Sequence, residues 1–412
     1  MPSICLYFKV HQPFQLKKYS GNDVTVEHCY EDAVADERLI NILADECYLP
    51  SNEIMHKLIN DQEGKFKISF AISGTVIELL MKYRPDVITS FQKLVATGMV
   101  SILAETYFHS LSYLYSPNEF KRQVYKHGQL IKKVFGIKPT VFRNTELIHD
   151  NQLAGMVAEM GYKGLLCEGH KSILNGRTAN RVYAAPGNDS FGLLLRNTSL
   201  SDDIAFRFDD VHWNEYPLTA EKFANWLRAD ADDANVVNIF LDYETLGIYK
   251  KPASGIFEFL QALPGEIVNN TSYAFVSPEE VLTTTTPAGV YDCSQTVSWE
   301  NKERERYVWC ENMMQNNSIK KIYSLENKVL QHACVDAIAA WGRLQAADYF
   351  NYMSHERGAA DEHIYHHEFD SPLHVFRNYT NILTDFELML IRKGLAESRK
   401  EFPMQYADLR LF

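Results

Sequence analysis

The sequence lacks the long apolar run that a membrane-spanning helix needs. Such a helix takes roughly 20 consecutive apolar residues, and no run in this 412-residue chain approaches that length. The first residues, Met1 to Cys5, enter a strand-like segment at once, without the basic region and small-residue cleavage site of a signal peptide. We therefore expect a cytoplasmic protein that does not engage a membrane.

Cysteine is scarce and unpatterned. The chain has seven cysteines, an odd number, and no CxxC pair, whereas disulfide frameworks and zinc sites use even or closely spaced sets. Cys5 and Cys167 lie in apolar strand-like runs, where a reduced thiol acts as a small core residue. This pattern again favours a reducing cytoplasm.

Basic residues are fewer than acidic residues. Lys and Arg number 41 against 53 Asp and Glu, which gives a formal net charge of −12 and disfavours binding to nucleic acid phosphates. The strand ends described below carry neither HxH nor HExxH spacing, and there is no glycine-rich phosphate loop. We interpret residues 230–233, rich in Asp, and 363–367, rich in His, as solvated or packed segments without a metal. We therefore expect no nucleic acid partner, no metal and no other cofactor, although Asp, Glu and His together could still hold Mg²⁺ or Mn²⁺.

Strand-like runs alternate with helix-like runs through the larger part of the chain, which is typical of βα units and a parallel sheet. Strands are predicted at residues 4–10, 66–72, 99–105, 138–146, 164–167, 191–196, 236–242 and 273–277, and helices at 31–48, 51–60, 75–83, 85–97, 117–135, 151–160 and 220–229. The strand pattern is compatible with a barrel of seven strands and with a barrel of eight. A polar run at residues 283–289 predicts a boundary between a barrel at 1–285 and a mainly helical domain at 290–412.

The most informative run is residues 236–247, where an apolar strand ends in two acids, Asp242 and Glu244. Burying a charge at such a position costs desolvation free energy. Side chains alternate along a strand, so these acids are predicted to share one face, with Tyr243 on the other. Acidic residues at these positions could also serve as a helix cap or in a structural salt bridge.

Three further strands run into His11, Glu105 and Glu146 in the same way. The carboxyl ends of parallel strands share one face of an α/β barrel, where catalytic groups gather. Two carboxylates from different strands can act on a glycosidic bond, one at the anomeric carbon and one as proton donor to the leaving oxygen. The same groups could instead bind a metal ion.

Five segments, in order, resemble the signature regions of glycoside hydrolase family 57: His11–Pro13, Ala104–Leu111, Phe142–Glu146, Leu241–Gly247 and Leu344–Met353. The resemblance implies an α/β fold, a distorted (β/α)7 barrel with a mainly helical C-terminal region that contributes to the cleft. It also implies a retaining α-glycosidase with Glu146 as nucleophile and Asp242 as general acid/base. On the same ground His11, Glu105, His109 and Asp348 are expected to bind the substrate.

Two residues depart from parts of that family. Lys9 and Arg143 stand where glucanotransferase and branching members commonly carry a histidine and a tryptophan. These departures favour the α-amylase branch, with an α-1,4-glucan or maltooligosaccharide as substrate. The alternatives are a 4-α-glucanotransferase, a noncatalytic glucan-binding homologue and a metal-dependent deacetylase on a related barrel. Linkage preference, chain-length preference, oligomeric state and heat stability are not readable from the sequence.

Three aromatic residues near the predicted cleft are candidate sugar platforms, because sugars present apolar C–H faces to flat rings. They are Trp213, Tyr249 and Trp299, and plain packing is the alternative for each. Glu244 is expected to bind substrate and rivals Asp242 for the acid role, since it is longer and on the same predicted face. We assign the role of general acid/base to Asp242 because the family resemblance implies it. Retention requires the two carboxyl groups to lie about 5 to 5.5 Å apart.

Overall fold

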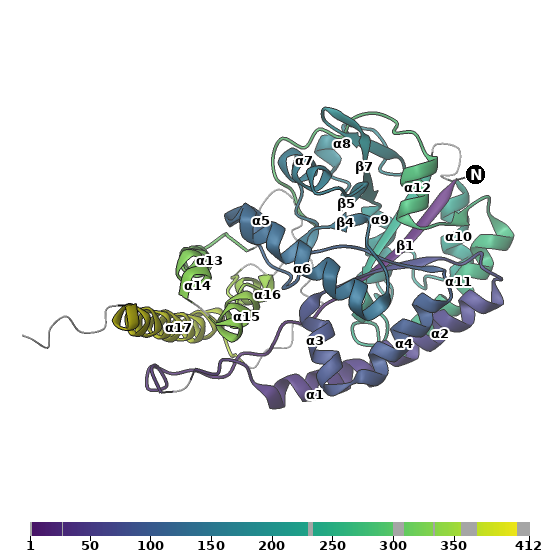
Figure 1. Ribbon diagram of the computed structural model, residues 1–412. Helices are drawn as coiled ribbons and strands as arrows, with labels where there is room; N and C mark the ends of the chain where they lie inside the picture. The colour runs from purple at the N-terminus through teal and green to yellow at the C-terminus, as the bar shows by residue number, and fades with distance from the viewer. Residues whose placement is uncertain are drawn as a thin grey trace, which may run out of the picture.

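The computed structural model describes residues 2–26, 28–229, 234–299, 309–332, 334–355 and 369–401. A barrel wrapped by helices forms one part of the molecule, and a group of C-terminal helices projects beside it (Figure 1). The Asp-rich run at 230–233 and the histidines at 363–367 lie outside the described residues. No helix in the described part combines the length and apolar character that crossing a membrane requires.

A strand is present at each of the eight predicted places, although the bounds of several differ from the prediction. The strands are β1 (Ser3–Val10), β2 (Ile68–Ile72), β3 (Val100–Ile102), β4 (Val141–Arg143), β5 (Gly164–Glu168), β6 (Val182–Ala185), β7 (Asn188–Arg196), β8 (Val236–Asp242) and β9 (Ala274–Phe275). The predictions at 99–105 and 138–146 were too long, because β3 and β4 each span three residues and then turn toward the site. The antiparallel β6, paired with β7, was not predicted.

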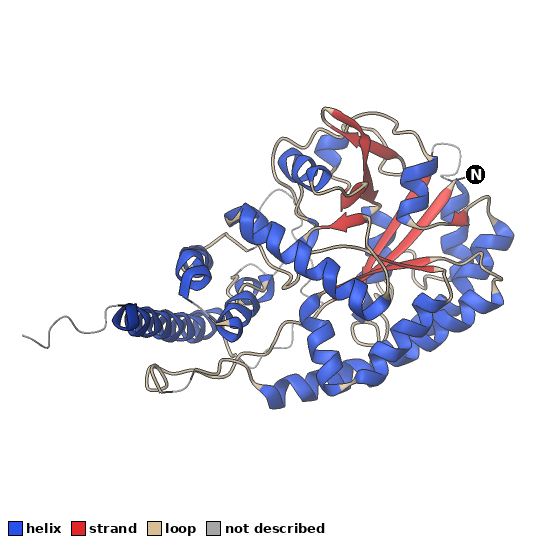
Figure 2. Cartoon of the chain, in the orientation of Figure 1, coloured by secondary structure: helices blue, strands red, loops and turns tan. Residues whose placement is uncertain are grey.

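Seven parallel strands form the barrel in the order β3-β2-β1-β8-β7-β5-β4. The two edge strands meet through one bridge between Ala104 and Phe142. There the Ala104 N–H donates to the Val141 carbonyl at 2.9 Å and the Arg143 N–H to the Ala104 carbonyl at 2.8 Å. The ring therefore closes with seven strands at a seam held by few hydrogen bonds, which confirms the predicted distorted α/β barrel. Figure 2 shows the strands in red with helices in blue around them.

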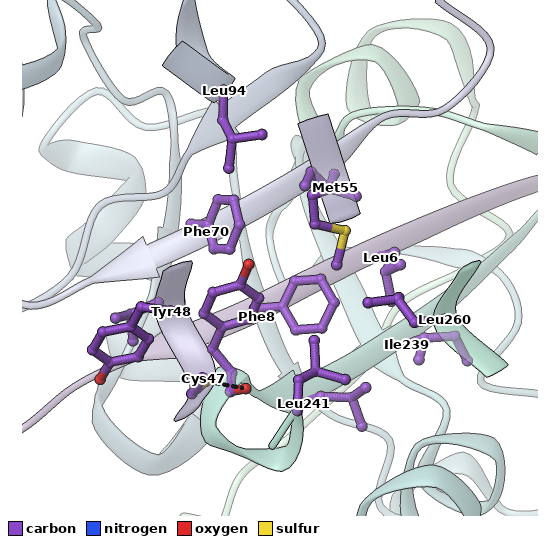
Figure 3. Packing of buried hydrophobic residues seen from close by; sticks show 14 of the residues in the cluster. Leu6, Phe8, Cys47, Tyr48, Met55, Phe70, Leu94, Ile239, Leu241 and Leu260 are labelled. Atoms are coloured by element: carbon purple, nitrogen blue, oxygen red, sulfur yellow. Dashed lines mark hydrogen bonds between the residues drawn. The ribbon is translucent and has the colours of Figure 1, made fainter. Parts of the chain in front are cut away.

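Alternation along β1 separates the two sides of the barrel wall. Leu6 and Phe8 point outward and pack under the helices with Tyr48, Met55, Phe70, Ile239 and Leu241 (Figure 3). Cys5 and Tyr7 point inward and share the barrel interior with Phe240. The next inward position is Lys9, so the period of two places a lysine in the mouth of the barrel.

The helices before residue 285 cover the barrel. They are α1 (Ala33–Leu43), the π-helical η1 (Ala44–Tyr48), α2 (Leu49–Asp61), α3 (Gly74–Tyr83), α4 (Pro85–Ala96), α5 (Ser112–Tyr115), α6 (Pro117–Phe135), η2 (Thr145–Leu147), α7 (Asn151–Glu159), α8 (Lys171–Leu174), α9 (Thr198–Ala205), α10 (Ala220–Ala229), η4 (Tyr243–Thr245), η5 (Pro252–Ser254), α11 (Ile256–Asn270) and α12 (Pro278–Thr284). The bounds predicted for α6 are confirmed: Ser116 caps its start and Gly136, at φ 73°, ends it.

The two helices predicted at residues 31–48 and 51–60 are instead one continuous run, joined by η1. Pro50 brings no N–H and its ring crowds the carbonyl four residues earlier, that of Glu46. A wider π-turn accommodates this without ending the helix. A Cβ on Gly247 would lie 2.0 Å from that same Glu46 oxygen, so only glycine allows the loop after β8 to pack against η1.

The C-terminal helices are α13 (Met313–Ser324), α14 (Glu326–His332), α15 (Val335–Arg343), α16 (Ala347–Asn351) and α17 (Pro372–Glu401). Residues 290–299 precede them and run along the barrel through two bridges, Ala184 to Val290 and His149 to Val297. The N-terminal loop reaches α17, where Asp385 accepts hydrogen bonds from the Tyr30 hydroxyl at 2.7 Å and the Thr25 N–H at 2.6 Å. The division at residues 285 and 290 stays a prediction.

Candidate active site

At the mouth of the barrel, the ammonium of Lys9 lies between Glu146 and Asp242. Its Nζ is 3.4 Å from Glu146 Oε1 and 3.1 Å from Asp242 Oδ1. Lys9 and Asp242 are direct register partners of the parallel β1–β8 pair, so their side chains leave the sheet on the same side. The two carboxylate oxygens therefore lie at most about 6.5 Å apart, which is compatible with the spacing that retaining glycosidases use.

A strained turn presents Glu146. β4 ends at Arg143, and Glu146 and Leu147 follow in η2 with φ of 50° each. Left-handed backbone is unfavourable for residues with a Cβ and persists where the surrounding contacts impose it, often at functional sites. His109, at φ 51°, is strained in the same way. Two segments of the site thus depart from regular backbone where they face each other.

Three donors converge on the carboxylate of Glu146. His109 Nε2 is 2.5 Å from Oε1, the Trp299 indole N–H donates to Oε2 at 2.6 Å, and Lys9 adds its charge. Burial alone would raise the pKa of Glu146, but the charges of Lys9, His109 and Arg143 and the hydrogen bond from His109 hold it well below the usual range. Glu146 is therefore a carboxylate at neutral pH, the form that can attack carbon.

Glu105 lies behind His109. Its side chain is fully buried, and its Oε2 is 3.2 Å from His109 Nδ1 and 3.9 Å from Arg143 Nη1. Burial works against the charged imidazole, yet the hydrogen bonds and charges of Glu105 and Glu146 raise the pKa of His109. The structure thus brings Glu105 and His109 together beside Glu146, and His109 links the two carboxylates.

His11 and Asp348 form a second pair beside His109. His11 Nε2 is 2.9 Å from Asp348 Oδ2, and its ring stacks on that of His109 at 4.0 Å between centroids. Ser73 holds the other nitrogen, Nδ1, at 2.7 Å and also caps α3. The Ala347 N–H donates to the His109 carbonyl at 3.0 Å, so the C-terminal helices return Asp348 to the mouth of the barrel.

Glu244 does not follow the alternation predicted from the sequence. β8 ends at Asp242, and the next three residues form the 3₁₀ turn η4. The Tyr48 hydroxyl, on η1, donates to Glu244 Oε1 at 2.5 Å. Burial and the negative charge of Asp242 raise the pKa of Glu244 to about 7. Tyr249 is half-buried next to it and donates its N–H to the Glu244 carbonyl at 2.9 Å.

The two tryptophans have different surroundings. Trp299 is only 3% exposed, stacks on Phe206 at 6.3 Å and donates to Glu146. Its ring is too buried to be the open platform that we predicted. Trp213 lines a hollow of about 560 Å³ together with Trp226 and Asn180. The Asn180 carbonyl accepts from the Val236 N–H, so this hollow lies toward the end of β8 opposite Asp242. The structure therefore places Trp213 in a hollow apart from the acids.

The sequence analysis assigned no place in the site to Lys9, Arg143, Ser73 or Tyr48, although each contacts one of the candidate residues. Lys9 had the same signal as Asp242, a charged residue at the inward end of an apolar strand. Arg143 is fully buried, and its guanidinium lies over the Phe240 ring at 5.1 Å. Nothing in the sequence pairs Ser73 or Tyr48 with the site, because each joins it through a contact between distant segments. Within the described residues, no three His, Cys, Asp or Glu side chains group as metal ligands would.

Comparison with known proteins gives a consistent result. The sequence profile of "Glycosyl hydrolase family 57" matches residues 5–294. A protein of Methanocaldococcus jannaschii named "Putative alpha-amylase" is 37% identical over 425 aligned residues, 98% of this chain and 89% of its own.

Solved structures share the fold at low identity. The 4-alpha-glucanotransferase from Thermococcus litoralis superposes with a TM-score of 0.69 at 15% identity over 93% of this chain, which spans 59% of that protein. A GH57 branching enzyme from Thermococcus kodakaraensis superposes with a TM-score of 0.68 at 12% identity, over 97% of this chain and 94% of its own. At these identities the likeness establishes the fold.

Proposed function

Because this chain belongs to glycosyl hydrolase family 57, we propose that it hydrolyses α-1,4-glucans or maltooligosaccharides by a double displacement that retains the anomeric configuration. The observation that carries the proposal is the pair of carboxylates, Glu146 and Asp242, on either side of one ammonium. A nucleophile and a proton donor on opposite sides of a bond are what the reaction needs. The name of the Methanocaldococcus jannaschii relative supports an amylase activity.

In the first step, Glu146 attacks the anomeric carbon while the bond from that carbon to the glycosidic oxygen breaks. Asp242 gives its proton to the departing oxygen. In the second step, Asp242 takes a proton from water, the water oxygen bonds to the anomeric carbon, and Glu146 leaves as a carboxylate. Asp242 thereby regains a proton, and release of the product completes the cycle.

The contacts of Glu146 suit a nucleophile that must also be a leaving group. Lys9, His109 and the Trp299 N–H stabilise its negative charge, which is the charge it regains when the covalent intermediate breaks down. His11 and Asp348 are assigned to the hydroxyl groups of the sugar at the nucleophile, since both are polar and lie beside His109.

The assignment is tested with starch, glycogen, maltoheptaose and α-galactosides, comparing the native protein with Glu146→Gln. We expect α-glucan cleavage by the native protein only, with the α-anomer as the first product seen by ¹H NMR. In Glu146→Ala, added azide should restore cleavage and give a glycosyl azide of β configuration, because azide replaces the missing nucleophile.

Equal activity of the native and Glu146→Gln proteins would remove Glu146 from the mechanism. A β-anomer as first product would show inversion and reject the double displacement. Longer oligomers formed from maltotriose alone would show that the protein transfers glycosyl units to sugars instead of water.

A further inference from the structure

The double displacement needs no lysine between its two carboxylates, yet Lys9 occupies that place. Its side chain is buried, at 7% exposure, and its ammonium contacts one oxygen of each acid. The register of β1 against β8 fixes Lys9 beside Asp242. The ammonium therefore lies in the space between the nucleophile and the acid, where a glycosidic bond must enter to react.

Lys9 is a permanent cation. Burial works to lower its pKa, but the charges of Asp242 and Glu146 raise it above the ordinary value for lysine. A cation–π contact with Trp299 also stabilises the ammonium, since Nζ lies over the indole ring at 5.8 Å from its centroid. Lys9 thus carries its charge at neutral pH.

This charge conflicts with the role of Asp242 as an acid. An ammonium 3.1 Å from a carboxylate stabilises the ionised form and opposes protonation, whereas the first step needs a proton on Asp242. The conflict disappears if substrate separates the two groups. Lys9 already has a second partner for its charge, Glu146 at 3.4 Å, so it can leave Asp242 without becoming unpaired.

We propose that Lys9 is a positioning residue that holds Asp242 ionised in the empty site and gives it up when an α-glucan binds, so that Asp242 acquires its proton from solvent only in the complex. The sugar oxygen at the scissile bond then takes the place of the ammonium beside Asp242. Lys9 remains on Glu146 and stabilises its charge. The proposal rests on the proposed function for the roles of the two acids.

The other ionisable groups around these three residues stay in place in the test described below. The cations are His109, Arg143 and Arg196; the acids are Glu105, Glu244 and Asp348; the remaining groups are His11, Tyr48 and Tyr249. Of these, His109 and Arg143 lower the pKa of Glu146, so the nucleophile keeps two cations when Lys9 is replaced. Glu244 lies near Asp242, and a negative charge on Glu244 would favour protonation of Asp242.

The test compares the pH dependence of kcat/KM, which reports the free enzyme, with that of kcat, which reports the complex. In the native protein, the alkaline limb of kcat/KM should fall at lower pH than that of kcat. Lys9→Met should move the limb of kcat/KM upward by about one pH unit or more and bring the two limbs together. Lys9→Arg, which keeps the charge, should leave the limbs separated. A merely structural role for Lys9 would lower activity in both variants and move neither limb.

Infrared spectroscopy of the unliganded protein tests the same idea without turnover. The difference spectrum of Lys9→Met minus native, taken between pH 5 and 7, should show a new protonated-carboxyl band that is absent from Lys9→Met/Asp242→Asn. No such band would overturn the proposal, as would unmoved limbs. Absence of any α-glucan cleavage by the native protein would instead reject the proposed function, and the infrared result would still decide whether Lys9 holds Asp242 ionised. Far-UV circular dichroism verifies that each variant is folded.

Discussion

The indole N–H of Trp299 donates to Oε2 of Glu146 at 2.6 Å, across 153 residues of sequence. The contact is possible because Val297 and His149 pair as a two-hydrogen-bond bridge, with 2.9 Å in each direction. That bridge ties the segment entering the C-terminal helices to the loop that follows Glu146. The carboxylate of Glu146 is thus held partly by a part of the chain outside the βα repeats.

Replacing Trp299 with Phe should lower kcat/KM about tenfold or more, because a hydrogen bond to a charged group is worth roughly 1.5 to 3 kcal/mol. Phe keeps an aromatic ring against Phe206 and removes only the donor and part of the ring area. Steady-state kinetics on maltoheptaose measure the effect. Trp213→Phe is the matched control and should keep native kinetics, since Trp213 lines the separate hollow. Equal losses in both variants would contradict the distinction.

Gly342→Ala should destabilise the protein by about 1 to 3 kcal/mol, the usual result of overpacking a core. A Cβ at this position would lie 2.2 Å from Cε2 of Phe108, the residue before His109. Gly128→Ala, in the middle of α6, meets nothing within 4 Å and should stabilise by about 0.5 to 1 kcal/mol. Urea denaturation measures both changes. An unchanged free energy of unfolding in Gly342→Ala would show that the Phe108 ring can move to make room for the added methyl group.

His149→Phe should flatten the pH dependence of stability below pH 6.5. Burial lowers the pKa of His149 to about 4, so between pH 6.5 and 4 the unfolded chain binds a proton that the folded protein excludes. Native stability therefore falls as pH falls through this window, by on the order of 3 kcal/mol. Phe keeps a ring against Tyr291 and carries no proton. Thermal melts at pH 4.5 and 7 give the slopes, and His212→Phe, on an exposed loop, should keep the native slope.

Glu244→Gln should show the opposite trend. The pKa of Glu244 is raised to about 7 in the folded protein, so the stability it contributes is present below the unfolded value and is lost as pH rises toward 7. Gln stays neutral and still accepts from Tyr48. The variant should thus gain stability relative to the native protein between pH 5 and 8, by up to about 3 kcal/mol. Urea denaturation at both pH values measures the difference, and a difference that does not vary with pH would show that Glu244 is ionised throughout.

Sequence patterns predicted the barrel well where the signal was local. β8 and α10 have the predicted bounds, because an apolar β-branched run and an amphipathic run with good helix formers each specify one structure. The failures lie where a contact from elsewhere decides. In the continuous α1–η1–α2 run, the Glu46 carbonyl that Pro50 crowds lies against the loop at Gly247, and the short β3 and β4 depend on closing the barrel through Ala104 and Phe142.

The site shows the same limit. Strand ends and ordered motifs singled out His11, Glu105, His109, Glu146, Asp242 and Asp348, which the structure brings to one mouth. Trp213 and Trp299 had equal standing as aromatic residues near the predicted cleft. Their difference, one in a separate hollow and one bonded to Glu146, depends on where two loops pack, and loop packing leaves no periodic signal.

The sequence by itself determined that acids and histidines stand at the carboxyl ends of parallel strands, because alternation and apolar patterning act over a few neighbouring residues. Only the tertiary structure decided which charges meet. The β1–β8 register places Lys9 against Asp242, the strained turn at Glu146 brings a second carboxylate to the same ammonium, and the Val297–His149 bridge brings Trp299 to Glu146. Each of these joins residues far apart in the chain, and electrostatic energy depends on distance in space and on burial, which local sequence does not encode.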